Sequence, residues 1–71
     1  MEKFGQKLST LRKRRGLTLR QLPELLGVHY THLNNIEIGK RSPSTFLVVK
    51  ISELFDVSTD RLMKDYFELD D

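Results

Sequence analysis

The chain has 71 residues, a length that makes a single domain and leaves no room for the deep cleft of an enzyme. It has no cysteine, which excludes disulfide bonds and thiolate metal sites, and its longest uninterrupted apolar run, Phe46-Leu47-Val48-Val49, is far shorter than the ~20 residues of a membrane helix. The N-terminus carries charges where a signal peptide would have its apolar core, so we expect a soluble, intracellular protein.

The formal net charge is only +2, but the charges are distributed unevenly. Residues 1–41 hold nine Lys or Arg against three acids, a balance of +6, whereas residues 42–71 hold three against seven, a balance of −4. This asymmetry suggests a basic face for nucleic acid and an opposed acidic face. The alternative is a charged, solvated surface without a nucleic-acid partner.

An apolar stripe at helical spacing predicts a first helix over residues 2–15. The stripe consists of Phe4, Leu8 and Leu11. Gly16 predicts the end of this helix. The cations at 12–15 would occupy its last turn, where the helix dipole favours positive charge even without DNA.

Three later helix starts share one pattern, in which an apolar residue, a capping residue and a second apolar residue have the spacing of a hydrophobic staple. The three sets are Leu17/Thr18/Leu22, Val28/His29/Leu33 and Val57/Ser58/Leu62. Thr18 and Gln21 also have the spacing of a capping box, whereas His29 is a poorer cap than Ser or Thr.

A second helix over residues 19–26 and a third over residues 30–38 would be joined by a tight turn at Gly27. Such a pair, crossing at a steep angle, predicts a helix-turn-helix whose second helix enters a DNA major groove. Gly39 would end the third helix, and Leu33 and Ile36 would point inward.

Pro23 fits the second helix poorly, because it would be the fifth helical residue after a Thr18 cap. Its missing N–H and its ring cost up to ~3 kcal/mol in a helix interior. We therefore expect a kinked, frayed or 3₁₀-like first turn.

Ser44 predicts the N-cap of a fourth helix, which we expect to be the most buried element. Its apolar face consists of Leu47, Val48, Ile51, Leu54 and Phe55. A fifth helix after Ser58 would place four apolar residues at helical spacing, before an acidic end. These residues, Leu62, Met63, Tyr66 and Phe67, with Leu69 beyond them, exceed what a small core needs, so segment 58–71 is predicted to contribute to a dimer interface. The alternative is that they only cap the core of a monomer.

A combined pattern extends over nearly the whole chain: Gly16-Leu17-Thr18, Leu22, Glu24, Leu26-Gly27-Val28, Leu33, Ile36-Glu37, Gly39-Lys40 and Pro43-Ser44. This pattern resembles the Cro and phage-repressor type helix-turn-helix, the Xre family. The resemblance implies an all-α, lambda-repressor-like domain of five helices, usually a homodimer, whose third helix contacts DNA bases. It also implies a cytoplasmic protein encoded by a bacterium or a phage.

The resemblance, carried over position by position, assigns base contacts to the start and outer face of the third helix. These residues are His29, Tyr30, Thr31, Asn34 and Asn35. Asn can pair bidentately with adenine, Thr can contact thymine, and Tyr and His can donate to a base or a phosphate. The alternative for each is a solvated helix face.

Contacts with the DNA backbone are expected from four further side chains, Arg20, His32, Lys40 and Arg41, which would position the protein and make binding depend on salt. The resemblance also implies a partly buried ion pair between Arg12 and Glu37, which would orient the third helix. Leu19 and Pro23 depart from the family pattern, which often has Gln and a small residue at these positions.

Other chemistry finds little support in the sequence. His29 and His32 have a spacing that can hold a metal, but without Cys and with Glu37 already paired we expect neither a metal nor a cofactor. No nucleophile and base have a supporting third group. The C-terminal acids, Asp60, Asp65, Glu68, Asp70 and Asp71, lack the spacing of a calcium loop and are interpreted as solvated surface.

We therefore expect a sequence-specific transcriptional regulator, a dimeric repressor or controller that binds a pseudo-palindromic site in double-stranded DNA. One alternative is an antitoxin-type protein that acts mainly through a protein partner. Another is an interaction module with a degenerate DNA-binding face.

Overall fold

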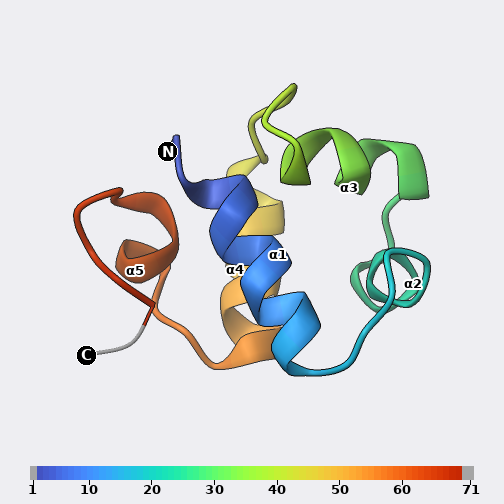
Figure 1. Cartoon of the computed structure of the whole chain (residues 1–71), viewed down its shortest axis with the longest axis horizontal. Helices are drawn as coiled ribbons and strands as arrows, with labels where there is room; N and C mark the ends of the chain where they lie inside the picture. Colours follow the sequence, from blue (N-terminus) through green and yellow to red (C-terminus); the bar gives the residue numbers. More distant parts are fainter. Residues whose placement is uncertain (1, 70–71) are drawn as a thin grey trace.

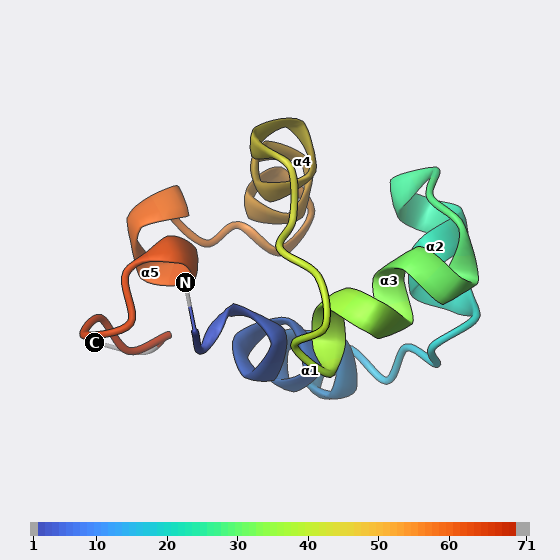
Figure 2. The same ribbon diagram turned by 90° about the horizontal axis from the view of Figure 1, so that it is seen from above.

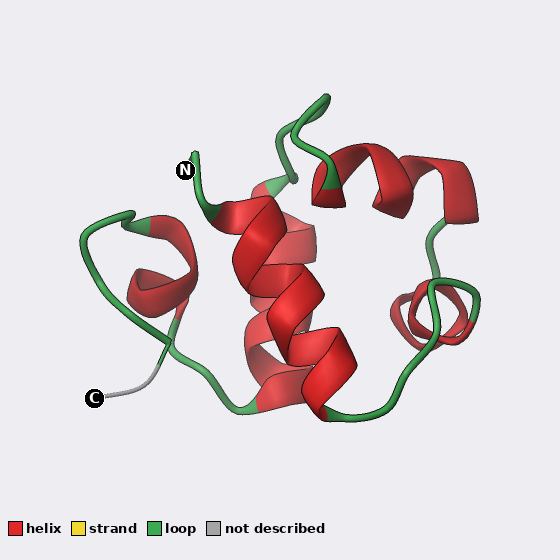
Figure 3. Cartoon of the chain, viewed as in Figure 1, coloured by secondary structure: helices red, strands yellow, loops and turns green. Residues whose placement is uncertain are grey.

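The computed structural model describes residues 2–69, which form five α-helices and no strand (Figures 1 and 3). The helices are α1 (Phe4–Arg14), α2 (Gln21–Leu26), α3 (Tyr30–Glu37), α4 (Thr45–Phe55) and α5 (Thr59–Met63). The predicted all-α architecture is confirmed. Within the described residues, no helix is long and apolar enough to cross a membrane.

The core lies between α1 and α4, with α5 at one end and α2 and α3 at the other (Figure 2). All five helices contribute to it through Phe4, Leu8, Leu11, Leu22, Leu26, Leu33, Ile36, Leu47, Val48, Ile51, Phe55 and Leu62. The predicted stripe of the first helix is therefore confirmed. Burial of these apolar surfaces is the main favourable term in folding.

The prediction that the fourth helix is the most buried element is wrong. Phe46 and Val49 of α4 are 72% and 43% exposed, because its apolar residues surround the helix and only one side of it meets the core. By contrast, α1 buries two charged side chains, Lys7 and Arg12, in addition to its apolar stripe. Their hydrogen bonds, described below, make this burial possible.

Three predicted caps are confirmed at the starts of α3, α4 and α5. The Nδ1 atom of His29 accepts from the N–H of Thr31 at 3.4 Å. The hydroxyl oxygens of Ser44 and Ser58 accept from N–H groups three residues later, at 3.1 and 3.2 Å. Each satisfies one of the backbone donors that a helix start leaves unpaired.

The start of α2 shows how Pro23 is accommodated. Thr18 and Gln21 form the predicted reciprocal capping box, with bonds of 2.9 and 3.1 Å, but the helix begins only at Gln21, after a turn at residues 19–20. Pro23 is therefore the third residue of α2, where a missing N–H costs little. The expected irregular first turn is confirmed.

The ends of α2 and α3 depend on glycines in the left-handed conformation. Gly27 has a φ of 70° and Gly39 a φ of 85°, values that other residues rarely adopt. After each glycine the chain turns back, and the next N–H donates to a carbonyl five residues earlier, from Val28 to Pro23 at 3.0 Å and from Lys40 to Asn35 at 2.8 Å. Lys50 of α4 supports the first turn by donating to the carbonyl of Leu26 at 2.8 Å.

The prediction that the fifth helix extends to Tyr66 and Phe67 is wrong, because α5 ends at Met63 and Lys64 is extended. The buried ammonium group of Lys7 forms hydrogen bonds with backbone carbonyls at the C-terminal end of α5 and after it. It donates to the carbonyl oxygens of Arg61, Lys64 and Phe67 at 2.6, 2.9 and 2.7 Å. A lysine of α1 therefore replaces the hydrogen bonds that a longer helix would have formed.

Asp65 lies at the surface, but it also has a structural role that the sequence did not predict. Its two carboxylate oxygens accept the N–H groups of Glu2 and Lys3, both at 2.9 Å, and so cap the start of α1. These bonds, above all the one from Lys3, lower the pKa of Asp65 from its usual 3.8. Lys7, near the N-terminus, thus donates to the C-terminal segment, and Asp65, in that segment, accepts from the N-terminus. Together they link the two ends of the described chain.

This arrangement changes the predicted dimer surface. Leu62 is completely buried in the core, so it is not available to a second copy. Met63, Tyr66 and Phe67 are 38%, 76% and 38% exposed, and the two aromatic rings lie 4.9 Å apart. Asp70 and Asp71 lie outside the described residues.

Candidate nucleic-acid interface

The third helix lies along one edge of the molecule, beside the N-terminal end of α1 and above α2 in Figure 1. Leu33 and Ile36, which are 0% and 1% exposed, attach one side of α3 to the core, as predicted. The opposite side faces away from the protein. The loop 39–43 projects beside this edge (Figure 1). An exposed helix with a rigid attachment is the arrangement that major-groove contact requires.

The five residues predicted to contact bases differ in accessibility. His29, Tyr30 and Thr31, at the start of α3, are exposed, whereas Asn34 and Asn35 are half-buried. His32, predicted at the DNA backbone, is also half-buried. The first turn of α3 is therefore its most accessible part.

His29 has a structural role in addition to its exposed position. Because its Nδ1 atom accepts the N–H of Thr31, the ring carries its proton on Nε2. This leaves Nε2–H as the donor that an acceptor outside the protein could use. The weak cap that the sequence predicted thus also fixes the direction of a donor at the start of α3.

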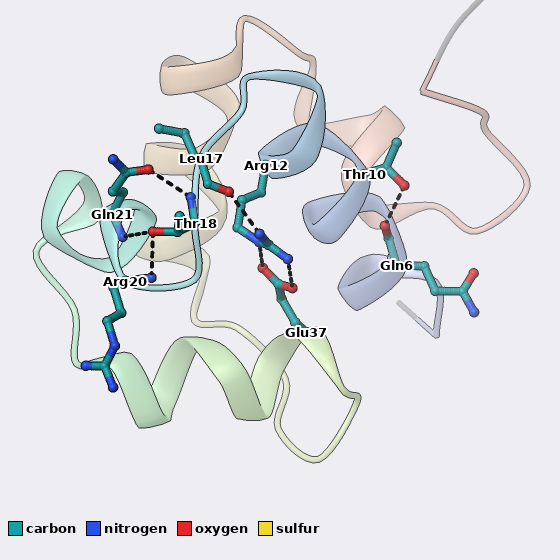
Figure 4. Close-up of polar contacts among 8 residues, drawn as sticks. All are labelled: Gln6, Thr10, Arg12, Leu17, Thr18, Arg20, Gln21 and Glu37. Carbon is teal, nitrogen blue, oxygen red and sulfur yellow. Dashed lines mark hydrogen bonds and ion pairs between the residues drawn. The ribbon is translucent and has the colours of Figure 1, made fainter.

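Arg20 and Tyr30 come together from two helices. The guanidinium carbon of Arg20, the residue before α2, lies 4.9 Å from the ring centroid of Tyr30, the first residue of α3. This is a cation–π distance. In Figure 4 the Arg20 side chain extends from the turn before α2 towards the N-terminal end of α3. Both residues were predicted at the interface from the sequence, but their contact was not.

Lys40 and Arg41 follow the other end of α3. Their backbone N–H groups both donate to the carbonyl of Asn35, at 2.8 and 3.2 Å, which fixes the loop. Both side chains are exposed. Positive charge is therefore present beyond both ends of α3, from Arg20 at its start to Lys40 and Arg41 after its end.

The ion pair predicted from the resemblance is present (Figure 4). Nε of Arg12 lies 2.9 Å from Oε2 of Glu37, and Nη2 lies 3.3 Å from Oε1. The remaining Nη1 donates to the carbonyl of Leu17 at 2.9 Å. Because the side chains are only 10% and 7% exposed, this bidentate pair links α1, the C-terminal end of α3 and the turn before α2 in a largely dry environment.

Gly5 is a residue at this junction that sequence analysis missed. A Cβ atom at this position would meet the carbonyl oxygen of Glu37 and would lie 2.6 Å from that of Ile36. The absence of a side chain thus lets α1 approach the backbone at the end of α3. The only sequence sign was a glycine inside a helical pattern, which often marks such a close approach.

Among residues 2–69, the structure brings no three His, Asp or Glu side chains together in a way that could hold a metal ion. The chain has no Cys to add.

Comparison with known proteins agrees with this geometry. A family model described as helix-turn-helix matches residues 8–62, which include all of α2 and α3. The chain belongs to this Xre-type helix-turn-helix family. A relative in Bacillus subtilis, the HTH-type transcriptional regulator ImmR, is 36% identical over 60 residues, which cover 84% of this chain and 47% of ImmR. The chain thus spans about half the length of ImmR.

Two solved structures of the family have the same fold. The N-terminal DNA-binding domain of SinR from Bacillus subtilis has a TM-score of 0.84 and 32% identity, covering 96% of this chain and all of that one. The restriction-modification controller protein C.AhdI from Aeromonas hydrophila has a TM-score of 0.77 and 31% identity, covering 87% and 94%. The predicted five-helix fold of the family is confirmed by both.

Proposed function

We propose that this helix-turn-helix protein is a sequence-specific DNA-binding regulator of transcription whose α3 enters the major groove. The observation that carries the proposal is the placement of α3. Its inner side is fixed by Leu33 and Ile36, its first turn is exposed, and cations lie beyond both ends. The names of the relatives, which are transcriptional regulators, and of the SinR domain, which binds DNA, support the same function.

The residues at the surface have chemistry that suits this task. His29, through Nε2–H, and Thr31, with a hydroxyl and a methyl group, would meet base edges at the start of α3. Asn34 and Asn35 would follow along the helix, each with an amide that matches adenine. Tyr30 belongs to the same set in this proposal.

Backbone contacts would come from Arg20, His32, Lys40 and Arg41. A loop beside an inserted helix faces the phosphates, which Lys40 and Arg41 would neutralise. Each neutralised phosphate releases counterions, so affinity should fall steeply as salt increases.

We further propose that the protein binds as a homodimer, a repressor or controller at a pseudo-palindromic operator. Met63, Tyr66 and Phe67 are exposed apolar residues at the end of α5 and in the segment that follows it. Helix α5 lies at the opposite end of the molecule from α2 (Figure 1). Two copies of α3, ~34 Å apart, would contact matching half-sites.

Selection from a pool of random duplexes at two salt concentrations tests DNA recognition. The expected result is a two-fold symmetric consensus, bound with an affinity that falls steeply with salt. A pool that yields no consensus, or binding that disappears at physiological salt, would contradict it. In that case the antitoxin-type alternative, action through a protein partner, would take its place.

The dimer is tested by a pair of matched variants. Tyr66 and Phe46 are both aromatic and 76% and 72% exposed, but only Tyr66 belongs to the proposed interface. Tyr66→Glu should give a monomer in analytical ultracentrifugation and bind single half-sites weakly, whereas Phe46→Glu should remain dimeric. The dimer proposal fails if both variants sediment like the unaltered protein.

A further inference from the structure

Arg20 and Tyr30 are both surface residues, and yet their side chains are in contact with each other. The guanidinium carbon lies 4.9 Å from the ring centroid, although both side chains are exposed. The main chain of Arg20 is fixed as well, because its N–H donates to the hydroxyl of Thr18 at 3.3 Å within the capping-box turn. Arg20 is thus held at both its backbone and its charged end.

We propose that Arg20 and Tyr30 act as one unit that determines specificity. In this unit Arg20 contacts the edge of a guanine in the major groove, and Tyr30 is a positioning residue that holds the guanidinium beside the first turn of α3. The inference rests on the proposed DNA-binding function. It moves Arg20 from the backbone contacts to the base contacts, and it removes Tyr30 from direct contact with bases.

The chemistry of the two possible targets favours guanine. The Tyr30 ring lies under the guanidinium of Arg20, so it restricts the directions in which the plane of N–H donors can face. A bidentate bond to O6 and N7 of guanine needs such a plane, whereas a phosphate accepts a cation from many directions. A pre-oriented side chain also loses less rotamer freedom when it binds.

The other cations at this surface show the contrast. Within residues 2–69, the side chains of Lys40 and Arg41 form no hydrogen bond or ring contact and are exposed. Their charged groups can therefore adapt to a phosphate, because no contact within the described residues holds them in one orientation. Arg20 alone among these three is oriented before DNA arrives.

Four variants with a matched control separate these roles. Arg20→Lys keeps the charge but loses the planar edge, Tyr30→Phe keeps the ring, and Tyr30→Leu removes it. Arg20→Met removes the charge, and Arg41→Met does the same at an exposed arginine of the loop. All five variants change exposed residues, at positions 20, 30 and 41, so each should melt like the unaltered protein, which is checked first.

Each variant is taken through duplex selection and then through competition binding with single-base changes, at two salt concentrations. The unaltered protein should select a guanine in each half-site. Arg20→Lys and Tyr30→Leu should each lose about tenfold or more of the preference for it, while Tyr30→Phe keeps it. Arg41→Met should weaken binding equally on all sequences and reduce the salt slope by about 1 per half-site.

Several results would overturn the inference. Retention of the guanine preference by Arg20→Lys would make Arg20 a phosphate contact, and loss of it in Tyr30→Phe would make the Tyr30 hydroxyl the contacting group. A consensus without guanine refutes only this inference, whereas no consensus at all refutes the proposed function and the inference together.

The stacking itself is tested without DNA. In NMR spectra of the free protein, the ring current of Tyr30 should shift the Nε–H and Cδ–H signals of Arg20 upfield. The shift should persist in Tyr30→Phe and disappear in Tyr30→Leu. Identical Arg20 signals in all three proteins would show that the ring does not hold the guanidinium.

Discussion

Replacement of Glu37 by alanine should destabilise the whole domain and not merely weaken DNA binding. Arg12 and Glu37 are 10% and 7% exposed, and the carboxylate accepts two of the three hydrogen bonds of the guanidinium. Glu37→Ala would leave a charged group in a dry site with only the carbonyl of Leu17. Breaking one side of such a pair costs ~3–5 kcal/mol.

This cost is large relative to the total free energy of unfolding of so small a domain. A domain of 71 residues has a free energy of unfolding of roughly 4–10 kcal/mol, from about 0.05–0.15 kcal/mol per residue. For a domain of this size, 1 kcal/mol corresponds to about 4–8 °C in Tm, so Glu37→Ala should lower Tm by at least about 12 °C. Urea unfolding followed by circular dichroism gives the free energy directly.

Two further variants make the assay specific to the pair. Glu53→Ala, an exposed acid on α4, should change stability by less than about 0.5 kcal/mol. The double variant Arg12→Met/Glu37→Met removes both charges and should be less destabilised than the sum of the two single changes, because no buried charge is left alone. A Glu37→Ala protein within about 1 kcal/mol of the unaltered one would refute the reasoning.

Three other contacts give predictions of defined sign. Gly5→Ala should destabilise the domain by about 1–3 kcal/mol in urea unfolding, because the new Cβ meets the backbone of α3. Alanine is the better helix former, so a gain in stability would contradict this explanation. Lys7→Met should cost roughly 3 kcal/mol and speed hydrogen exchange in residues 64–69, because three carbonyls lose their donor. Lys3 is an exposed lysine, and an equal effect of Lys3→Met would argue against this role of Lys7. The lowered pKa of Asp65 means that its carboxylate stabilises the fold above pH 3.8 and that this contribution is lost as the pH falls through the folded-state pKa. Asp65→Asn should therefore melt below the unaltered protein at pH 7, and the gap should narrow as the pH is lowered towards 2. A gap that stays constant over this range would exclude this cause.

The sequence predicted what depends on neighbours along the chain. The apolar stripe of α1 and the caps at Ser44 and Ser58 repeat local spacings, so their prediction needed no tertiary information. The Arg12–Glu37 pair, 25 residues apart, followed from the family resemblance and not from spacing. Even the irregular start of α2 could be anticipated, because the effect of Pro23 is confined to its own turn.

What the sequence did not predict depends on residues that are distant along the chain. Lys7 and the carbonyl of Phe67 are 60 residues apart, and their bond shortens α5 relative to the helix that apolar spacing suggested. Asp65 and Lys3 are similarly separated, so an acid near the C-terminus was interpreted as solvated surface. Helical spacing alone could not show that the end of α5 would be satisfied by a side chain of α1.

The two ends of α3 are secured by different forces, and this difference has a functional consequence. At its C-terminal end, Glu37 is bound in a nearly dry ion pair and the backbone lies against Gly5, so displacement there would cost both charge desolvation and packing. At its N-terminal end, the contacts are a histidine cap of 3.4 Å and an exposed cation–π pair, each weak in water. The C-terminal end of α3 therefore keeps the helix in register with the core. In the proposed dimer, that end preserves the spacing between the two copies of α3, while the Arg20–Tyr30 contact orients the guanidinium beside the exposed first turn.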